Sequence, residues 1–312
     1  MAAGSSKTVI YAALAGNLVI AITKFAAALW TGSSVMLSEG VHSLVDTGNQ
    51  GLLLYGHRRA NRPPDERHPL GFGRELYFWS FIVALLVFAL GAGVSLYEAI
   101  QQIREKHPIT DPAVNYAVIA VSMIFEGASW WIALQEFRKT KGDLSYFQAF
   151  KRSKNAPLFL VLFEDSAALI GLVIAFAGNV ASYHFGRPEF DGVASLGISL
   201  LLAVTATMLA RESKELLIGE PAGPGVTNSV MAIARAQEGV ERVNGMMTVH
   251  LAPDEIVLAL SLEFSDPLNT PGIEQRIAAL ERKLRTAHPQ IITVFMKPQS
   301  RDQFRQFSYH GP

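Results

Sequence analysis

Residues 37–51, LSEGVHSLVDTGNQG, place ionisable side chains inside a long apolar run. Glu39, His42 and Asp46 follow one another at intervals of three and four residues, so in a helix all three lie on one face. Asn49 extends that face by another turn. An ionisable group in a membrane-spanning helix costs roughly 3 kcal/mol and faces a protein interior or a water-filled path. The stretch therefore predicts a helical membrane protein with a polar site inside it.

The composition of the whole chain agrees with this prediction. Half of the 312 residues are hydrophobic, only 17% are charged, and the net charge is zero. Nucleic acid is not expected as a partner, because binding phosphates requires a surplus of basic residues. The chain has no cysteine, so disulfides and thiolate metal sites are excluded, and a metal would need nitrogen or oxygen ligands.

Six segments are long enough to cross a lipid bilayer, whose hydrocarbon core of about 30 Å takes about 20 residues of helix. They are predicted at 8–30, 34–56, 75–103, 113–137, 156–183 and 190–216. The connections after the second and fourth spans are rich in Arg and Lys, and those on the opposite side are poor in charge. Basic loops stay in the cytoplasm, so both termini are expected there. The expected location is a bacterial inner membrane. Lys24 lies near a span end and is expected to extend to the membrane surface.

The sequence changes character after the sixth span. EPAGPG at 220–225 ends that helix, since Pro and Gly cannot continue it. The pattern that follows predicts a small α+β, ferredoxin-like domain in the order αββαβ, and a sheet this small commonly pairs with a second copy. We therefore predict a six-helix transmembrane transport domain at 1–218, a cytoplasmic dimerisation domain at 219–299 and a polar, frayed tail at 300–312.

The fifth predicted span carries two adjacent acids, Glu164 and Asp165. Two carboxylates so close together in hydrocarbon cannot both be ionised without a cation nearby. They point about 100° apart on a helix, so both need not face the same ion. Together with His42 and Asp46 they can form a four-ligand metal site between two helices, and nitrogen with carboxylate oxygen suits zinc. The alternative for His42 and Asp46 is a hydrogen bond that satisfies two buried groups.

Other polar residues have more than one interpretation. Glu126, in the middle of the fourth span, is a metal ligand, a proton carrier or a protonated acid bonded to a neighbouring helix. Asn49 is a further candidate ligand or a support for one, and Glu39 is a gate-side or interfacial group. Asp65 and His68, in the loop before the third span, form either a metal-capturing loop or a tight turn. Titratable residues of the C-terminal domain lack ligand spacing, so ordinary surface roles are favoured over metal binding there.

Several motifs resemble the cation diffusion facilitator family of proton-coupled divalent-metal exporters, and the likeness covers nearly the whole chain. They are the His42–Asp46 face, HPLG at 68–71, Asp165 in the fifth span and Asp191-Gly192 at the start of the sixth. Within the family, the zinc transporter 9 branch is similar in three stretches. These are HSLVDTGNQGLL at 42–53, FEGA at 125–128 and EDSAALIG at 164–171.

The resemblance implies a homodimeric antiporter that exports a divalent transition metal, Zn²⁺ first, from the cytoplasm in exchange for protons. It implies metal ligands at His42, Asp46 and Asp165. The fourth ligand position of the family falls on Val161, which cannot bind metal, so Glu164, Glu126, Asn49 or water has to complete the site.

The resemblance also bears on the remaining alternatives. Phe72 stands where relatives with a loop metal site often carry His, which counts against a site at Asp65 and His68. The metal is expected as transported substrate, with no cofactor and no catalytic residue. Manganese, iron, cobalt or nickel in place of zinc is an alternative, as is a membrane-bound sensor that binds metal without transporting it. No HExxH helix or GxSxG elbow supports an enzyme.

Overall fold

The computed structural model describes residues 2–31, 34–105, 112–141, 145–187 and 189–307. It consists of two compact units, Met1–Lys214 and Glu215–Pro312, and each is described by itself below.

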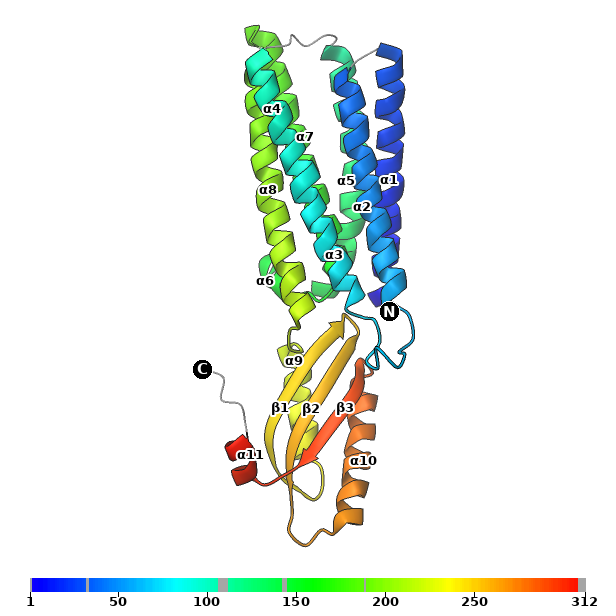
Figure 1. Cartoon of the computed structure of the whole chain (residues 1–312), viewed down its shortest axis with the longest axis vertical. Helices are drawn as coiled ribbons and strands as arrows, with labels where there is room; N and C mark the ends of the chain where they lie inside the picture. Colours follow the sequence, from blue (N-terminus) through cyan, green and yellow to red (C-terminus); the bar gives the residue numbers. More distant parts are fainter. Residues whose placement is uncertain (1, 32–33, 106–111, 142–144, 188, 308–312) are drawn as a thin grey trace. The chain divides into compact units, whose positions relative to one another are not determined.

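The first unit is built from long helices (Figure 1). In chain order they are α1 (Ala2–Thr31), α2 (Ser34–Ala60), α3 (Glu75–Leu86), the π-helical η1 (Val87–Ala92), α4 (Gly93–Glu105), α5 (Pro112–Lys141), the short α6 (Tyr146–Arg152), α7 (Ala156–Phe185) and α8 (Glu189–Ile218). The six predicted spans coincide with these helices to within a few residues at most ends, with α3, η1 and α4 together forming the third. The predicted class, a helical membrane protein followed by a small α+β unit, is confirmed.

Five helical segments in the described residues are long and apolar enough to cross a membrane. They are Val9–Ala26, Glu75–Arg104, Tyr116–Lys139, Ala156–Phe185 and Glu189–Ile218. Helix α2 is long enough but not apolar enough to be among them, because polar side chains interrupt its apolar sequence. The helix that carries the predicted polar face is therefore also the least hydrophobic of the predicted spans.

The π-helical turn η1 interrupts the third span. A π-helical turn widens the helix and shifts the backbone hydrogen-bonding pattern, and such turns are frequent at functional sites. Ser199 of α8 donates a hydrogen bond from Oγ to the carbonyl oxygen of Ala92 across 2.9 Å. This bond ties α8 to the end of the π-helical turn inside the bundle.

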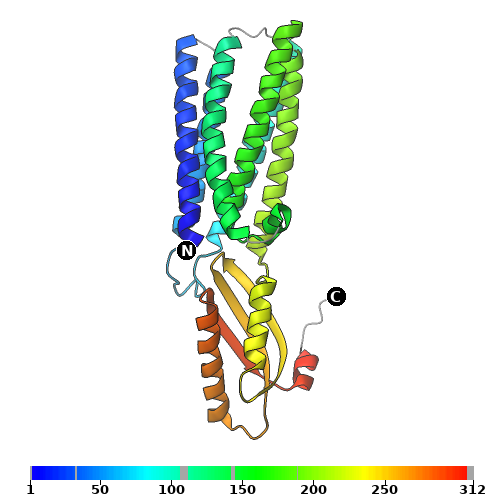
Figure 2. The ribbon, with the colours of Figure 1, turned by 180° about the vertical axis from the view of Figure 1, so that it is seen from behind.

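The long helices gather into two groups. Figures 1 and 2 show α1, α2 and α5 together on one side of the bundle and α4, α7 and α8 on the other. Helix α7 also packs against α5. A cavity of about 240 Å³ is lined by residues from both groups.

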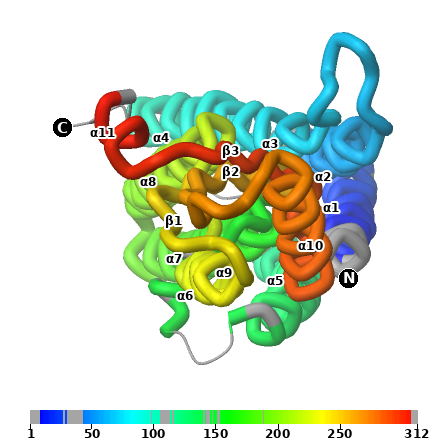
Figure 3. Tube along the Cα trace, turned by 90° about the horizontal axis from the view of Figure 1, so that it is seen from below, coloured from blue at the N-terminus to red at the C-terminus, as the bar shows by residue number. Residues whose placement is uncertain are grey.

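The second unit is a three-stranded sheet with helices on one face. Its elements are α9 (Pro224–Arg235), β1 (Val240–Ala252), β2 (Glu255–Phe264), α10 (Thr270–Ala287), β3 (Ile291–Pro298) and α11 (Arg301–Phe307). The strand order is β1-β2-β3, with β1 antiparallel and β3 parallel to the central β2. Figure 3 shows α9 and α10 on the same face of this sheet. The predicted order αββαβ is confirmed.

The core of the second unit lies between the sheet and these two helices. Alternate residues of β2 point toward it, as the sequence pattern predicts. They are Ile256, Leu258, Leu260 and Leu262, which are buried with Leu280 and Leu284 of α10.

The prediction of a frayed tail is wrong for residues 301–307, which form α11. Ser300 accepts a hydrogen bond from the backbone N–H of Gln303 at the start of this helix. Phe304 lies so close to Gly245 of β1 that a Cβ at that glycine would overlap its ring. The helix therefore depends on a contact distant in sequence, which a local pattern does not reveal.

Candidate functional site

The polar face of α2 points into the first unit. Asn49 and Gln50 are buried, and Asp46 is half-buried on the wall of the cavity. Glu39 and His42 lie earlier on the same helix, but their side chains are outside the described residues. Their roles as gate-side group and metal ligand therefore stay predictions.

The two adjacent acids of α7 are held by different neighbours. Asp165 is 2% exposed, and Ser129 of α5 donates a hydrogen bond from Oγ to its Oδ2 across 2.7 Å. Gln50 of α2 donates from Nε2 to Oε2 of Glu164 across 3.3 Å. Because neighbouring helical residues point about 100° apart, one acid connects α7 to α5 and the other connects it to α2.

Three buried polar atoms around Glu164 lack a hydrogen-bond partner among the described residues. They are Oε1 of Glu164, Oε1 of Gln50 and Nδ2 of Asn49, and the Asn49 amide lies close enough to act on the Glu164 carboxyl group. A buried polar atom without a partner costs about 1–3 kcal/mol. Two of the three are oxygens, and each can accept a hydrogen bond from a protonated group or coordinate a cation. This arrangement therefore fits a site that takes up a proton or a metal ion.

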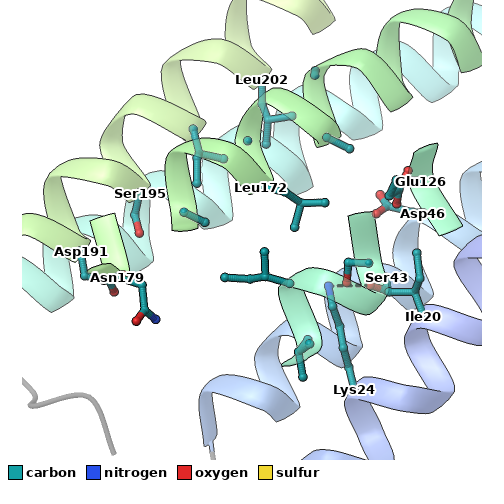
Figure 4. A pocket seen from close by; sticks show the side chains of 18 of the residues that line it. Ile20, Lys24, Ser43, Asp46, Glu126, Leu172, Asn179, Asp191, Ser195 and Leu202 are labelled. Atoms are coloured by element: carbon teal, nitrogen blue, oxygen red, sulfur yellow. Dashed lines mark hydrogen bonds between the residues drawn. The ribbon is translucent and has the colours of Figure 1, made fainter. Parts of the chain in front are cut away.

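Glu126 of α5 supplies a fourth carboxyl group. It is half-buried and lines the cavity together with Asp46, and Figure 4 shows these two side chains next to each other. Glu164 and Asp165 both interact electrostatically with Asp46 and Glu126. Acids from α2, α5 and α7 thus converge inside the bundle, where they cannot all be ionised unless cations offset them.

The convergence does not amount to a closed metal site. Within the described part of the chain, no three His, Cys, Asp or Glu side chains are arranged to hold a metal ion. The side chain of His42 falls outside that set. Val161, one turn before Asp165, is fully buried and apolar, so it leaves the corresponding ligand position empty of donors. Among the side chains that the structure describes, the predicted acids come together without assembling four ligands around one point.

Lys24 is buried, and the prediction that it extends to the membrane surface is wrong. Its side chain is 6% exposed, and its Nζ donates a hydrogen bond to Oγ of Ser43 across 3.0 Å. Ser43 lies one turn before Asp46, and all three residues line the same cavity. A sequence signal was present, because Asn17 and Lys24 are seven residues apart on the buried face of α1 that also carries Ile20.

The cavity has two polar ends. Figure 4 shows Lys24, Ser43, Asp46 and Glu126 at one end, and Asn179, Asp191 and Ser195 at the other. Apolar side chains, among them Leu172 and Leu202, line the wall between the two ends. An ion that enters this cavity therefore meets two separate sets of oxygen atoms.

The loop before α3 forms a tight turn. Oδ1 of Asp65 accepts hydrogen bonds from the backbone N–H groups of Arg67 and His68, and it lies 3.0 Å from Nδ1 of His68. Desolvation acts to raise the pKa of Asp65, but the hydrogen bonds and charge of His68 outweigh it and hold that pKa below its ordinary value. Both side chains are about half exposed. These contacts favour the turn over a metal-capturing loop.

His250 and His288 of the second unit are engaged separately. Nδ1 of His250 lies 3.1 Å from the carbonyl oxygen of Ala252. Nε2 of His288 lies 2.8 Å from Oγ of Ser229. Each contact involves a different element, so the described residues give no support to a shared metal site in this unit.

Comparison with known proteins finds relatives among membrane transporters. Residues 10–218 match the cation efflux transmembrane domain. The proton-coupled zinc antiporter SLC30A9, mitochondrial, of Xenopus laevis is 32% identical over 264 residues, which are 84% of this chain and 47% of the relative. The Homo sapiens protein of the same name is 30% identical, over 82% of this chain and 45% of its own length.

A plant protein is similar to the same degree. Metal tolerance protein C4 of Arabidopsis thaliana is 30% identical over 83% of this chain and 57% of the relative. The chain thus spans about half the length of the curated relatives it matches.

Proposed function

Because the chain belongs to the cation efflux family of membrane transporters, we propose that it is a secondary antiporter that exports a divalent transition metal from the cytoplasm in exchange for protons. Zn²⁺ is the proposed substrate, since two relatives at 32% and 30% identity are named proton-coupled zinc antiporters. The metal is cargo and not a cofactor. Family membership makes the chain a transporter rather than an enzyme.

The observation that carries this proposal is the convergence of carboxyl groups from three helices inside the bundle. Glu164 and Asp165 both interact electrostatically with Asp46 and Glu126, and Oε1 of Glu164 is buried without a hydrogen-bond partner among the described residues. Such a cluster cannot be fully ionised in the membrane interior unless cations offset its charge, and both cargo types of an antiporter are cations. Its location in the membrane interior is where transporter substrate sites lie.

We assign the metal site to His42, Asp46 and Asp165, with Glu164 as the fourth ligand. Glu126 is the proton carrier or an alternative ligand. Two further groups complete the proposal. Asn49 supports or replaces a ligand, and Glu39 acts on the gate side of the site.

The exchange follows from competition for the same atoms. A metal ion binds only deprotonated carboxylates and neutral imidazole, so metal entry releases protons and proton entry releases metal. Imidazole suits this role because its ordinary pKa, about 6.5, lies within the physiological range. Movement of one helix group against the other then opens the site to alternate sides of the membrane.

The proposed topology places the basic connections and both termini in the cytoplasm. The α2–α3 and α5–α7 connections, together with the last turns of α2 and α5 that lead into them, hold most of the Arg and Lys residues of the first unit, and the opposite connections hold few. A bacterial inner membrane is the proposed location.

The second unit offers a surface for a homodimer. Met247 pairs with Ala259, and Ala259 pairs with Phe295, so these three side chains form a row across the sheet. The row lies on the face opposite α9 and α10, where Met247 is 71% and Phe295 57% exposed. Exposed apolar rows of this kind mark interaction surfaces. We assign this face to contact with a second copy of the chain.

Zinc flux into proteoliposomes under an imposed proton gradient tests the proposed function. Asp46→Ala and Asp165→Ala should each abolish flux, and Asp254→Asn, which removes an exposed charge from the β1–β2 turn, should not. Undiminished flux in both alanine variants contradicts the site assignment. Saturable zinc binding without flux in the wild-type protein would favour the sensor, and preference for manganese, iron, cobalt or nickel in competition would change the substrate.

A further inference from the structure

The end of the cavity remote from Lys24 and Asp46 has its own polar group. It consists of Gln102 of α4, Asn179 of α7, and Asp191 and Ser195 of α8. Asn179 lies 14 residues after Asp165 on the same helix, which corresponds to about 21 Å at 1.5 Å per residue. Asn179 is therefore too far from Asp165 for the two side chains to hold one ion together.

Asn179 is the decisive residue of this group. Its side chain is 4% exposed, and its Oδ1 is buried without a hydrogen-bond partner among the described residues. It continues the line of α7 residues that face the cavity, after Gly171 and Ala175 at intervals of four. An amide oxygen buried in this way costs free energy unless a donor or a cation reaches it.

Asp191 adds a negative charge to the same end. Nε2 of Gln102 donates a hydrogen bond to its Oδ2. This bond fixes the orientation of the carboxylate between α8 and α4. Ser195, one turn further along α8, adds a hydroxyl oxygen.

Two glycines allow these helices to approach each other here. A Cβ at Gly178 would overlap the side chain of Ala194, and one at Gly192 would overlap Ile103. Gly178 immediately precedes Asn179, and Gly192 immediately follows Asp191. The close contacts of α7 with α8, and of α8 with α4, thus fix the positions of both side chains.

We propose that Asp191, Asn179 and Ser195 form a second, weaker cation site, where a partly hydrated divalent metal ion pauses on its way out of the central site. This inference rests on the proposed function, since it needs a metal that moves through the cavity. Carboxylate, amide and hydroxyl oxygens are ligands for divalent cations, and they bind transition metals less tightly than sites that include imidazole. Weak binding suits an exit, because an ion has to leave it again.

The site predicts an effect that depends on the side from which metal arrives. In proteoliposomes of one orientation, with the second unit outside, Zn²⁺ supplied outside reaches the central site first. Zn²⁺ loaded inside reaches the second site first. Asp191→Asn removes the charge and retains an acceptor for Gln102, and Asn179→Leu removes an oxygen that bonds to no described residue.

We expect both variants to raise the KM for Zn²⁺ from the inside, by roughly tenfold in Asp191→Asn, while the KM from the outside stays within about twofold. Outside-to-inside flux should keep its KM and lose turnover, since release becomes slower. Ser199→Ala is the matched control, because it removes a buried serine of α8 that bonds to Ala92 and does not line the cavity.

The two proposals fail differently. Wild-type protein that moves no Zn²⁺ in either direction overturns the proposed function and this site with it. Wild-type flux combined with an unchanged inside KM in both variants overturns the second site alone. Equal changes of KM from both sides, or the same change in Ser199→Ala, would show a structural role for these residues and would likewise overturn the site.

Discussion

Nζ of Lys24 donates a hydrogen bond to Oγ of Ser43 across 3.0 Å, inside the membrane unit and one helical turn from Asp46. A buried ammonium is expensive unless the surrounding groups stabilise its charge. Here it shares a cavity with Asp46 and Glu126. The protein thus carries a cation of its own beside the acids proposed to bind metal and protons.

A positive charge at Lys24 should oppose the binding of a divalent metal. Lys24→Met, which keeps the length of the side chain and removes its charge, is expected to tighten zinc binding by roughly tenfold, or about 1.4 kcal/mol. Lys24→Arg retains the charge and is expected to change the affinity much less. Calorimetric titration of the purified full-length protein with Zn²⁺ measures both. Equal affinities of the wild-type protein and Lys24→Met would contradict this role.

Ser129 should matter because it binds a carboxylate proposed as a ligand. Its hydroxyl donates across 2.7 Å to Asp165, and a hydrogen bond to a charged group contributes about 1.5–3 kcal/mol. Ser129→Ala is expected to raise the KM for Zn²⁺ flux by roughly tenfold or more, with the helical content unchanged. Ser122→Ala removes another buried serine from the same helix and cavity and serves as the control. A KM equal in the two variants would show that the bond does not position Asp165.

The membrane helices and the second unit could be predicted because their signals are local. Apolar runs of about 20 residues mark spans wherever they pack. The alternation of Ile256, Leu258 and Leu260 marks a strand with an apolar face in any context, and the structure places that face in the core, although Val257 and Ser261 of the opposite face are buried too. Helix α11 was not predicted, because it packs through a contact between Phe304 and Gly245, which are far apart in the sequence.

Only the charged residues of the candidate site could be predicted, because a charged side chain in an apolar helix is conspicuous. Asp46, Glu126 and Asp165 stand out because a carboxyl group in hydrocarbon demands a reason. Ser129 and Asn179 carry no such signal, since neutral polar residues are common in spans. Their importance depends on which helix faces which, and that is a property of the packed bundle. Lys24 differs, because its spacing from Asn17 was a usable signal and its distance from the span end was not.

The exposed row on the sheet should determine the oligomeric state. Phe295→Glu places a charge in the middle of the proposed contact, where it would be desolvated on association. The variant is expected to shift purified protein in detergent from dimer to monomer, as measured by light scattering. Thr286→Glu adds the same charge to the exposed side of α10 and should leave the dimer intact. A dimer that persists in Phe295→Glu would mean that this face is not the interface.

Glu164 and Glu126 should differ in how they couple metal to protons. Gln keeps the shape of each side chain and removes its ability to exchange a proton. Glu164 lies beside buried atoms without partners, so Glu164→Gln is expected to lower both zinc affinity and flux. Glu126 lines the cavity next to Asp46, so Glu126→Gln is expected to retain zinc binding and lose most of the acceleration by a proton gradient. Zinc flux measured with and without the gradient separates the two outcomes. Identical behaviour of both variants would mean that the acids act as one unit, without a distinct ligand and proton carrier.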